Sequence, residues 1–272
     1  ILLLPLAHEA LTAKLIERAG FEAFGMGGFA TSSTLLGRPD VGLLTFSEMV
    51  GYARNLVAAT TIPMLADADT GYGNVTNVMR TVSEYERAGV AGLLLEDQVS
   101  PKRCGHMAGK EVIPRGEMVG KIRAALRARE DPELLIVGRT DARAPLGLKE
   151  AIERGRAYAE AGADMIFVEA LETPEEMAEA NAAIPAPTLA NMVERGRSPL
   201  LPARELQALG FAAVAYPITL TLFIAKGALE LLCRLREEAS NTGLLPELMP
   251  FDDYNELVGL GEIRRVEEEL TG

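Results

Sequence analysis

The sequence predicts an α/β fold, a TIM-type (β/α) barrel of eight strands. Short aliphatic runs alternate with stretches of helical periodicity along all 272 residues. Each run is apolar throughout and lacks the polar alternation of a half-exposed sheet, which is typical of buried parallel strands. A doubly wound open sheet uses the same alternation and is the competing fold. No stretch has the composition of a linker, so we expect a single domain over residues 1–272.

The apolar runs place the strands at residues 2–5, 23–26, 63–67, 91–96, 134–137, 165–169, 188–191 and 212–216. Residues 27–40 are expected to form a long polar loop. Thr45 with Glu48 resembles a capping box, and Gly20 and Gly89 are well placed as helix stops. Helices are expected at residues 9–19, 45–60, 75–88, 117–129, 148–161, 174–183, 202–209, 220–238 and 251–270.

Composition narrows the class of protein. A net charge of −12 disfavours nucleic-acid binding, which needs clustered Lys and Arg. To bind an anionic substrate, a protein with this negative charge would need local positive charge at the site, from a metal ion or a few cationic side chains. The apolar N-terminus is too short to span a bilayer and has no cleavage-site pattern, so no membrane association is expected. Two cysteines are too few for a disulfide framework and indicate a reducing compartment, so we expect a cytoplasmic enzyme.

Polar side chains follow most of the predicted strands, at the point where each strand ends. In a barrel these ends point to one face, where active sites are built. Turn polarity could explain any single position, but the recurrence favours a convergent site. The side chains concerned are Asp67, Asp69, Glu96, Asp97, Arg139, Asp141, Glu169, Asn191 and Glu194.

Asp67 and Asp69 stand two residues apart at a strand end, where Gly71 and Gly73 let the backbone turn tightly. Hard oxygen ligands of this kind suit Mg²⁺, which usually keeps waters and takes one or two carboxylates. The alternative is an Asp-rich turn that caps the next helix.

Residues 102–106 place a thiol among cations, in the order Lys102, Arg103, Cys104, Gly105 and His106. The nearby charges would favour the thiolate of Cys104, which suits a general acid or base near neutral pH. The two cysteines and two histidines, at positions 104, 233, 8 and 106, do not have the spacing of a four-ligand zinc site. The alternative is an exposed loop with incidental charges. The second cysteine, Cys233, lies in an apolar helical run and is expected in the core.

Two further features suit an anionic substrate. The backbone amides of Gly27 and Gly28 could bind a carboxylate. Arg139 is the predicted fixed cation for a substrate carboxylate, through its bidentate fork. The alternative for Arg139 is an ion pair with Glu169 or Asp141.

Several segments together resemble the isocitrate lyase/phosphoenolpyruvate mutase superfamily, in particular its short methylisocitrate lyase and carboxyvinyl-carboxyphosphonate phosphorylmutase branch. The resemblance follows the chain in order over nearly its whole length. The segments are DADTGYGN (67–74), LEDQVSPKRCGH (95–106), GRTDAR (138–143), VEA (168–170), LANMVE (189–194) and YP (216–217).

The resemblance implies a role for each matching residue. Asp67 would be the direct Mg²⁺ ligand, with Mn²⁺ as the alternative ion, while Asp69 and Glu96 would hold metal waters. Cys104 would protonate the enolate formed on C–C cleavage. Lys102, Gly105 and His106 would lie on a mobile loop that closes over the site, with Lys102 and His106 in catalytic roles and Gly105 at the substrate. The substrate would be contacted by Gly27, Gly28, Phe29, Asp40, Arg139, Glu169 and Asn191.

Departures from the methylisocitrate lyase pattern bear on the substrate. Val193 stands where those enzymes carry Thr, and Leu222 where they carry an Arg. Loss of an Arg removes a charge-assisted contact worth roughly 1.5–3 kcal/mol, which disfavours a tricarboxylate substrate. Gly27 replaces a Ser or Thr, and Gly25 replaces a Tyr, so the general base is unassigned, with Tyr72 as a candidate.

These inferences converge on a Mg²⁺-dependent carbon–carbon lyase acting on a 2-hydroxy or 2-oxo dicarboxylate, such as a substituted malate, methylisocitrate or oxaloacetate. A phosphorylmutase that forms a P–C bond is the first alternative, and a non-catalytic barrel for binding or assembly is the second. The resemblance also implies a homotetramer in which C-terminal helices are swapped between subunits, with residues 220–270 as the oligomer surface.

Overall fold

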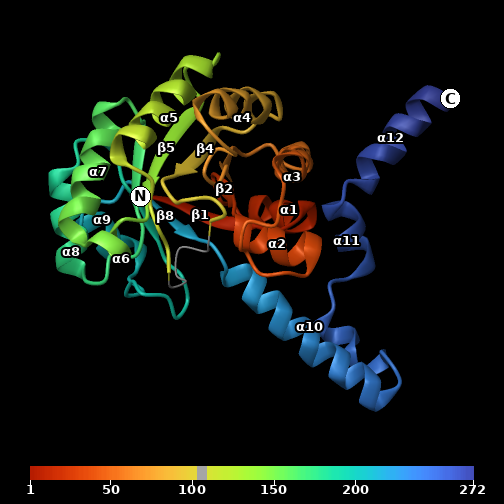
Figure 1. The fold of residues 1–272 in the computed structure, drawn as a ribbon. Helices are drawn as coiled ribbons and strands as arrows, with labels where there is room; N and C mark the ends of the chain where they lie inside the picture. Colours follow the sequence, from red (N-terminus) through yellow and green to blue (C-terminus); the bar gives the residue numbers. More distant parts are fainter. Residues whose placement is uncertain (103–108) are drawn as a thin grey trace. The chain divides into compact units, whose positions relative to one another are not determined.

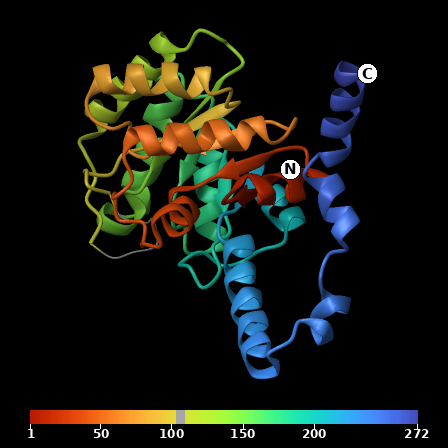
Figure 2. The ribbon, with the colours of Figure 1, turned by 90° about the vertical axis from the view of Figure 1, so that its right-hand side faces the viewer.

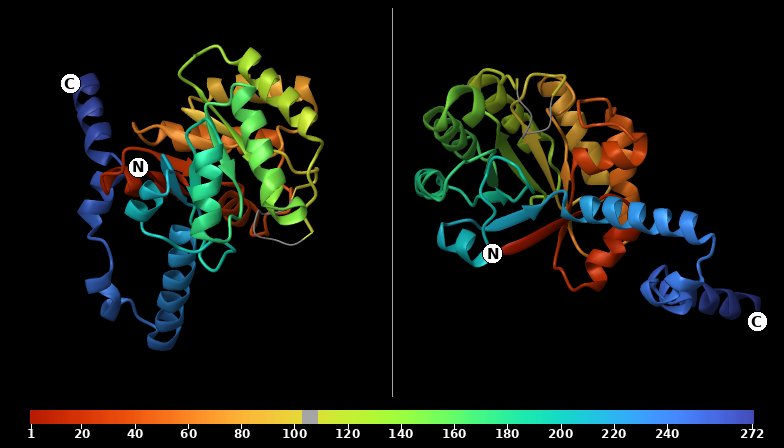
Figure 3. Two further views of the ribbon diagram at one scale, coloured as in Figure 1. Left: turned by 90° about the vertical axis from the view of Figure 1, so that its left-hand side faces the viewer. Right: turned by 90° about the horizontal axis from the view of Figure 1, so that it is seen from below.

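A computed structural model describes residues 1–102 and 109–272. The described residues form one eight-stranded parallel sheet in the order β6-β5-β4-β3-β2-β1-β8-β7. A parallel bridge between Ile166 and Thr188 joins the two outer strands, and helices surround the sheet (Figures 1 and 3). This closure confirms the TIM-type barrel and excludes the open sheet. The strands are β1 (Leu2–Ala7), β2 (Phe24–Met26), β3 (Met64–Asp67), β4 (Gly92–Glu96), β5 (Leu135–Thr140), β6 (Met165–Val168), β7 (Leu189–Asn191) and β8 (Ala213–Tyr216).

The predicted helices between the strands lie where the sequence places them, with small shifts at their ends. Residues 143–146 form a further short helix that the sequence did not predict. Thr45 and Glu48 form the predicted capping box, each side chain binding the other residue's backbone N–H. Gly20 and Gly89 both have φ of +87°, the left-handed conformation of a helix stop. These helices are α1 (Ala10–Arg18), α3 (Phe46–Ala58), α4 (Val75–Arg87), α5 (Arg115–Ala128), α6 (Arg143–Leu146), α7 (Leu148–Glu160), α8 (Pro174–Ala183) and α9 (Ala203–Ala208).

One prediction in this region is wrong. Residues 27–40 are not a loop throughout, because α2 (Gly28–Leu36) occupies most of the segment. Its Gly, Ser and Thr residues are weak helix formers, so local propensity does not explain it. Tertiary packing does: Ala30, Thr31 and Ser32 are buried.

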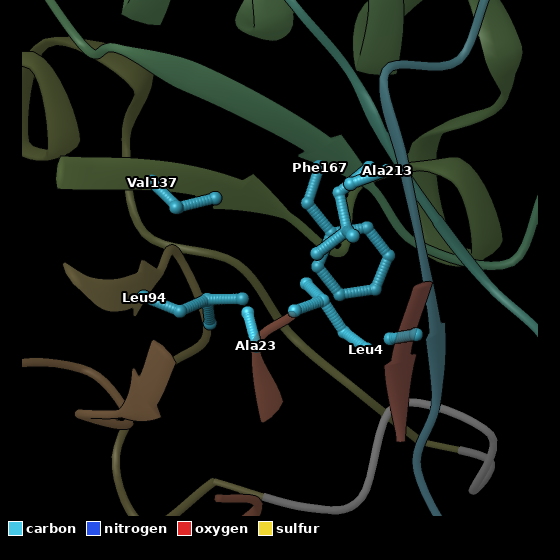
Figure 4. Close-up of a cluster of buried hydrophobic side chains, with 8 residues drawn as sticks. Leu4, Ala23, Leu94, Val137, Phe167 and Ala213 are labelled. Carbon is cyan, nitrogen blue, oxygen red and sulfur yellow. The ribbon is translucent and has the colours of Figure 1, made fainter. Parts of the chain in front are cut away.

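The barrel interior holds an aliphatic cluster with one aromatic ring, Phe167. Figure 4 shows its side chains, with Leu4 and Phe167 directed toward each other. Burial of this apolar surface is the main favourable term in folding. The cluster comprises Leu4, Ala23, Leu94, Val137, Phe167, Leu189, Ala213 and Ala215, with Leu2, Leu6, Leu65 and Met165 packed against it.

Residues 1–219 form one compact unit and residues 220–272 a second. In the second unit the chain reverses direction after α10 (Figure 2). Gly259, with φ of +85°, divides the helix predicted at 251–270 into two. The elements of this region are α10 (Thr219–Glu238), the 3₁₀ helix η1 (Thr242–Glu247), α11 (Phe251–Leu257) and α12 (Leu260–Thr271).

Cys233 is exposed, so its predicted place in the core is wrong. None of the residues of α10, all of which the structure describes, is buried. The apolar run that suggested a core position is therefore uncovered in the single chain. Among the described residues no helix is long and apolar enough to cross a membrane.

Asp97 links three elements beneath the strand ends. Its carboxylate accepts hydrogen bonds from Thr140 Oγ1 (2.7 Å), the backbone N–H of Asp141 (2.9 Å), Arg154 Nη1 (2.9 Å) and Tyr158 OH (2.7 Å). Both charged partners are buried, so the four bonds compensate for the lost hydration. Asp97 therefore ties β4 to β5 and α7 and is not part of the convergent site, although the sequence places it beside Glu96.

We expect Asp97→Asn to lower the free energy of unfolding by about 3 kcal/mol, because it removes the more deeply buried of the two carboxylates that pair with Arg154, the other being Glu150. Urea denaturation followed by circular dichroism measures the loss. Glu153→Gln is the matched control, because its ion pair with Arg156 is exposed and 3.6 Å long and should contribute under about 0.5 kcal/mol. Equal losses in the two variants would contradict a structural role for the Asp97 bonds.

Candidate active site

The carboxyl ends of the strands surround a pocket of about 330 Å³. Asp67 ends β3, Glu96 ends β4 and Arg139 lies in β5, so neighbouring strands bring these side chains to one end of the barrel. The pocket lining includes ten predicted site residues: Gly27, Gly28, Phe29, Asp40, Asp67, Glu96, Lys102, Arg139, Glu169 and Asn191.

Asp69 is buried beside the pocket, on a backbone with φ of +48°, an uncommon conformation for a residue other than glycine. Cys104, Gly105 and His106 lie outside the described residues.

Backbone amides hold both oxygens of Asp67. The N–H of Gly28, at the start of α2, donates to Oδ2 at 3.0 Å, and the N–H of Asp69 donates to Oδ1 at 3.0 Å. The helix N-terminus stabilises the carboxylate through its partial positive charge. A Cβ at Gly28 would lie 3.2 Å from Asp67 Oδ2 and 3.0 Å from Lys102 Nζ, so a side chain there would crowd the charged groups.

Lys102 is buried and doubly paired, which excludes the exposed-loop alternative for this residue. Its Nζ lies 2.7 Å from Asp40 Oδ2 and 2.8 Å from Asp69 Oδ1. Burial acts to lower the pKa of Lys102, but the carboxylates around it, led by Asp69, hold that pKa well above its usual value. Burial raises the pKa of Asp69 to about 6, and Lys102 opposes the rise.

Glu96 is 1% exposed, and its Oε1 has no hydrogen-bond partner among the described residues. Its Oε2 lies 3.5 Å from Arg139 Nε. Burial raises the pKa of the Glu96 carboxyl well above its usual range, with Arg139 opposing the shift. An unsatisfied buried carboxylate oxygen beside a pocket indicates a missing partner.

Arg139 forms both of the ion pairs that the sequence suggests as alternatives to substrate binding. Asp141 receives hydrogen bonds from Nε at 2.8 Å and from Nη2 at 3.0 Å, and Nη2 lies 3.0 Å from Glu169 Oε2. The guanidinium also lies over the ring of Phe167, 5.0 Å from its centre. Arg139 lines the pocket, and carboxylates of the protein already hold its Nε and Nη2 donors.

Glu169 and Asn191 complete this side of the pocket. Glu169 Oε1 accepts from the backbone N–H of Ala170 at 2.9 Å, and Asn191 Nδ2 donates to Glu169 Oε2 at 3.4 Å. Glu169 is buried, so its orientation is set by these contacts and by Arg139.

Sequence reasoning missed two buried lysines that support the site. Lys110 Nζ lies 2.7 Å from Asp141 Oδ1, behind Arg139. Lys121, on α5, donates to the backbone oxygen of Thr70 at 3.0 Å and so holds the loop after Asp67. Neither belongs to a motif, and each is brought to the site by helix and strand packing. The one sequence signal for Lys121 is that a charged residue stands on the apolar face of an amphipathic helix.

Tyr72 does not suit the role of general base. It is absent from the pocket lining given by the described residues. Burial raises the pKa of Tyr72 well above its usual value, which favours the neutral phenol over a proton-accepting phenolate.

The donor set fits a hard divalent cation. Asp67 and Glu96 present carboxylate oxygens at the pocket, and the unsatisfied Oε1 of Glu96 is the strongest indication. Within residues 1–102 and 109–272, no group of three acidic, His or Cys side chains is close enough to bind a metal directly.

Comparisons with known proteins agree over the whole chain. The sequence profile of the phosphoenolpyruvate phosphomutase family matches residues 1–233. The 2,3-dimethylmalate lyase of Eubacterium barkeri is 52% identical over 264 residues, which is 97% of this chain and 91% of that protein.

Two solved structures have the same fold. One is oxaloacetate acetylhydrolase in complex with the inhibitor 3,3-difluorooxalacetate, with a TM-score of 0.94 and 35% identity over 100% of this chain and 93% of that one. The other is phosphonopyruvate hydrolase in complex with oxalate and Mg²⁺, with a TM-score of 0.89 and 32% identity over 100% of this chain and 95% of that one. The chain belongs to the phosphoenolpyruvate phosphomutase family, within the isocitrate lyase/phosphoenolpyruvate mutase superfamily.

Proposed function

We propose that the protein is a Mg²⁺-dependent lyase that cleaves the C2–C3 bond of a 2-hydroxy dicarboxylate, with a substituted malate as the preferred substrate. The observation that carries the proposal is the pocket itself, in which carboxylates and two buried cations meet an apolar wall. The 2,3-dimethylmalate lyase at 52% identity supports it.

The apolar wall favours an alkyl-substituted substrate over an unsubstituted one. Barrel side chains of the aliphatic cluster, including Leu4, Leu94 and Phe167, face the pocket together with Leu65 and Ile218. A methyl group placed against such a surface gains roughly 0.8 kcal/mol by leaving water. A substrate that carries only charged groups would leave this wall without a partner.

Asp67, Asp69 and Glu96 are the residues that would hold the metal, Asp67 directly and the other two through waters. When bound, Mg²⁺ would stabilise negative charge as it develops on the substrate oxygens. The same ion would compensate the buried Glu96 oxygen that has no partner among the described residues. Mn²⁺ has the same preference for oxygen ligands and is the alternative ion.

Residues of the chain itself would bind and orient the substrate and protonate the enolate formed from it. The N–H of Gly28 is taken by Asp67, so the N–H groups of Gly27 and Phe29 on either side of it would bind the carboxylate of the 2-oxo acid end. Lys102, Arg139, Glu169 and Asn191 would orient the substrate, with Asp40 fixing Lys102. As the C2–C3 bond breaks, its electron pair passes to C3 as an enolate, the 2-hydroxyl proton leaves to a base, and C3 takes a proton from Cys104. Gly105 and His106 would lie beside this acid.

The function is tested by incubating the purified protein with Mg²⁺ and a panel of malate, 2-methylmalate, 2,3-dimethylmalate, methylisocitrate and oxaloacetate. We expect release of a 2-oxo acid, or of oxalate from oxaloacetate, with the fastest turnover on a substituted malate. EDTA should abolish turnover, and Mg²⁺ or Mn²⁺ should restore it.

Asp67→Asn should lower kcat/KM at least a hundredfold, since it removes the direct ligand of the metal.

The same experiment distinguishes two alternative functions, a phosphorylmutase and a non-catalytic barrel. The family profile is that of a phosphomutase, so a P–C bond-forming reaction is the second candidate. Phosphorus NMR with carboxyvinyl-carboxyphosphonate would detect it. No metal-dependent turnover with any substrate would overturn both enzymatic proposals and support a non-catalytic barrel for binding or assembly.

Cys104→Ser should lower kcat by about a hundredfold or more while KM changes little, because a serine hydroxyl is a much weaker acid than a thiol. Cys233→Ser is the matched control and should keep wild-type kcat, since Cys233 lies on α10 outside the pocket lining and the change is nearly isosteric. Steady-state kinetics on the best substrate measures both. Near-wild-type activity of Cys104→Ser would show that another group supplies the proton.

We also propose that residues 220–272 mediate assembly into a cytoplasmic homotetramer with exchanged C-terminal helices. Leu229 and Leu232 on α10 are 64% and 58% exposed, and α11 and α12 carry further exposed apolar side chains. Apolar surface of this extent is typical of an oligomer interface. Leu232→Glu should reduce the mass measured by light scattering below that of the tetramer, whereas Lys226→Ala should leave it unchanged. A wild-type monomer would contradict the proposal.

A further inference from the structure

The charges around the pocket leave an anionic substrate with few binding partners. Among the described residues, five carboxylates and three cations line the pocket. Two of those cations are committed: Lys102 is paired with Asp40 and Asp69, and Arg139 is held by its own carboxylates. A substrate with two carboxylates therefore needs a further positive charge for its second end.

Arg195 is the third cation. It lines the pocket and is exposed, on the segment that follows β7. Within residues 1–102 and 109–272, its side chain has no ion pair and no hydrogen bond. Its guanidinium is therefore available to a ligand, with both parallel donors of its fork.

The backbone at Arg195 gives an independent reason to assign it a role. The N–H of Gly196 donates to the backbone oxygen of Val193 at 3.0 Å, which closes a tight turn with Arg195 at its third position. Arg195 has φ of +59°, where a turn of this kind favours glycine. The chain thus keeps an arginine at a position where glycine would be less strained, although a glycine stands directly beside it. Strained residues of this kind concentrate at ligand sites.

We propose that Arg195 binds the distal carboxylate of the substrate, the one farther from the Asp67 and Glu96 end, and thereby selects dianionic over monoanionic substrates. This inference rests on the proposed function, because it names the group that recognises the second carboxylate of the same substrate.

The test compares two neighbouring arginines. Arg195→Gln removes the proposed contact. Arg197→Gln removes the same charge from an exposed residue outside the pocket lining, whose Nη1 lies 3.6 Å from Glu172 Oε1. For the dicarboxylate that wild type turns over fastest, we expect Arg195→Gln to raise KM about tenfold with kcat within about twofold, the pattern for lost uniform binding. Arg197→Gln should keep the wild-type KM.

Competitive inhibitors separate carboxylate recognition from other effects. Malate and 2-hydroxybutyrate share a four-carbon chain, but only malate has a distal carboxylate. Arg195→Gln should weaken inhibition by malate about tenfold and leave inhibition by 2-hydroxybutyrate unchanged. Arg195→Lys should recover part of the malate affinity. Equal weakening of both inhibitors would overturn the proposal, as would equal effects of the two glutamine variants.

Arg195→Gly distinguishes binding from a structural role. It relieves the left-handed backbone, so we expect an unchanged or higher Tm together with the raised KM. A lower Tm with unchanged malate inhibition would assign Arg195 to the turn alone and overturn the proposal. If wild type neither turns over any dicarboxylate nor binds malate, the proposed function fails first, an outcome distinct from failure of the Arg195 assignment.

Discussion

The central physical constraint of this protein is the repulsion among acidic side chains that a parallel barrel brings to one end. β3, β4 and β6 each deliver a carboxylate to the pocket, at Asp67, Glu96 and Glu169. Buried like charges are unfavourable unless each has a partner. The surrounding structure supplies those partners: the first amide of α2 for Asp67, Lys102 for Asp40 and Asp69, and Arg139 for Glu169. Glu96 Oε1 has no hydrogen-bond partner among the described residues, and a divalent cation held beside it would compensate its charge.

The site rests on a second layer of buried polar contacts. Asp97 and Glu96 are consecutive, so in a strand their side chains point to opposite sides. Glu96 faces the pocket, and Asp97 binds Arg154 and Tyr158 of α7 on the other side of the sheet. Lys110 plays a similar part behind Arg139, through Asp141. Asp97 and Lys110 therefore help to fix the pocket residues in place, although neither lines the pocket.

The pocket combines two environments with different tasks. One side is polar and crowded with committed ion pairs, which makes it rigid and costly to rearrange. The other side is the apolar cluster of the barrel interior around Phe167. A ligand that fits both must carry charged groups at defined positions and an alkyl portion between or beside them.

The sequence by itself determined the barrel, because buried parallel strands leave a purely apolar signature and glycine stops such as Gly20 mark the helix ends. It also identified the strand-end residues that line the pocket, because a barrel brings all such ends together whatever its details. It could not foresee α2, whose weak helix formers are held by packing, or the exposure of Cys233, which depends on what covers α10. Nor could it separate Glu96 from Asp97, or recognise Lys121 and Arg195. Those distinctions depend on which way a side chain points and which distant charge it meets. Only the tertiary structure decides them, because pairing and burial are long-range properties that no local pattern encodes.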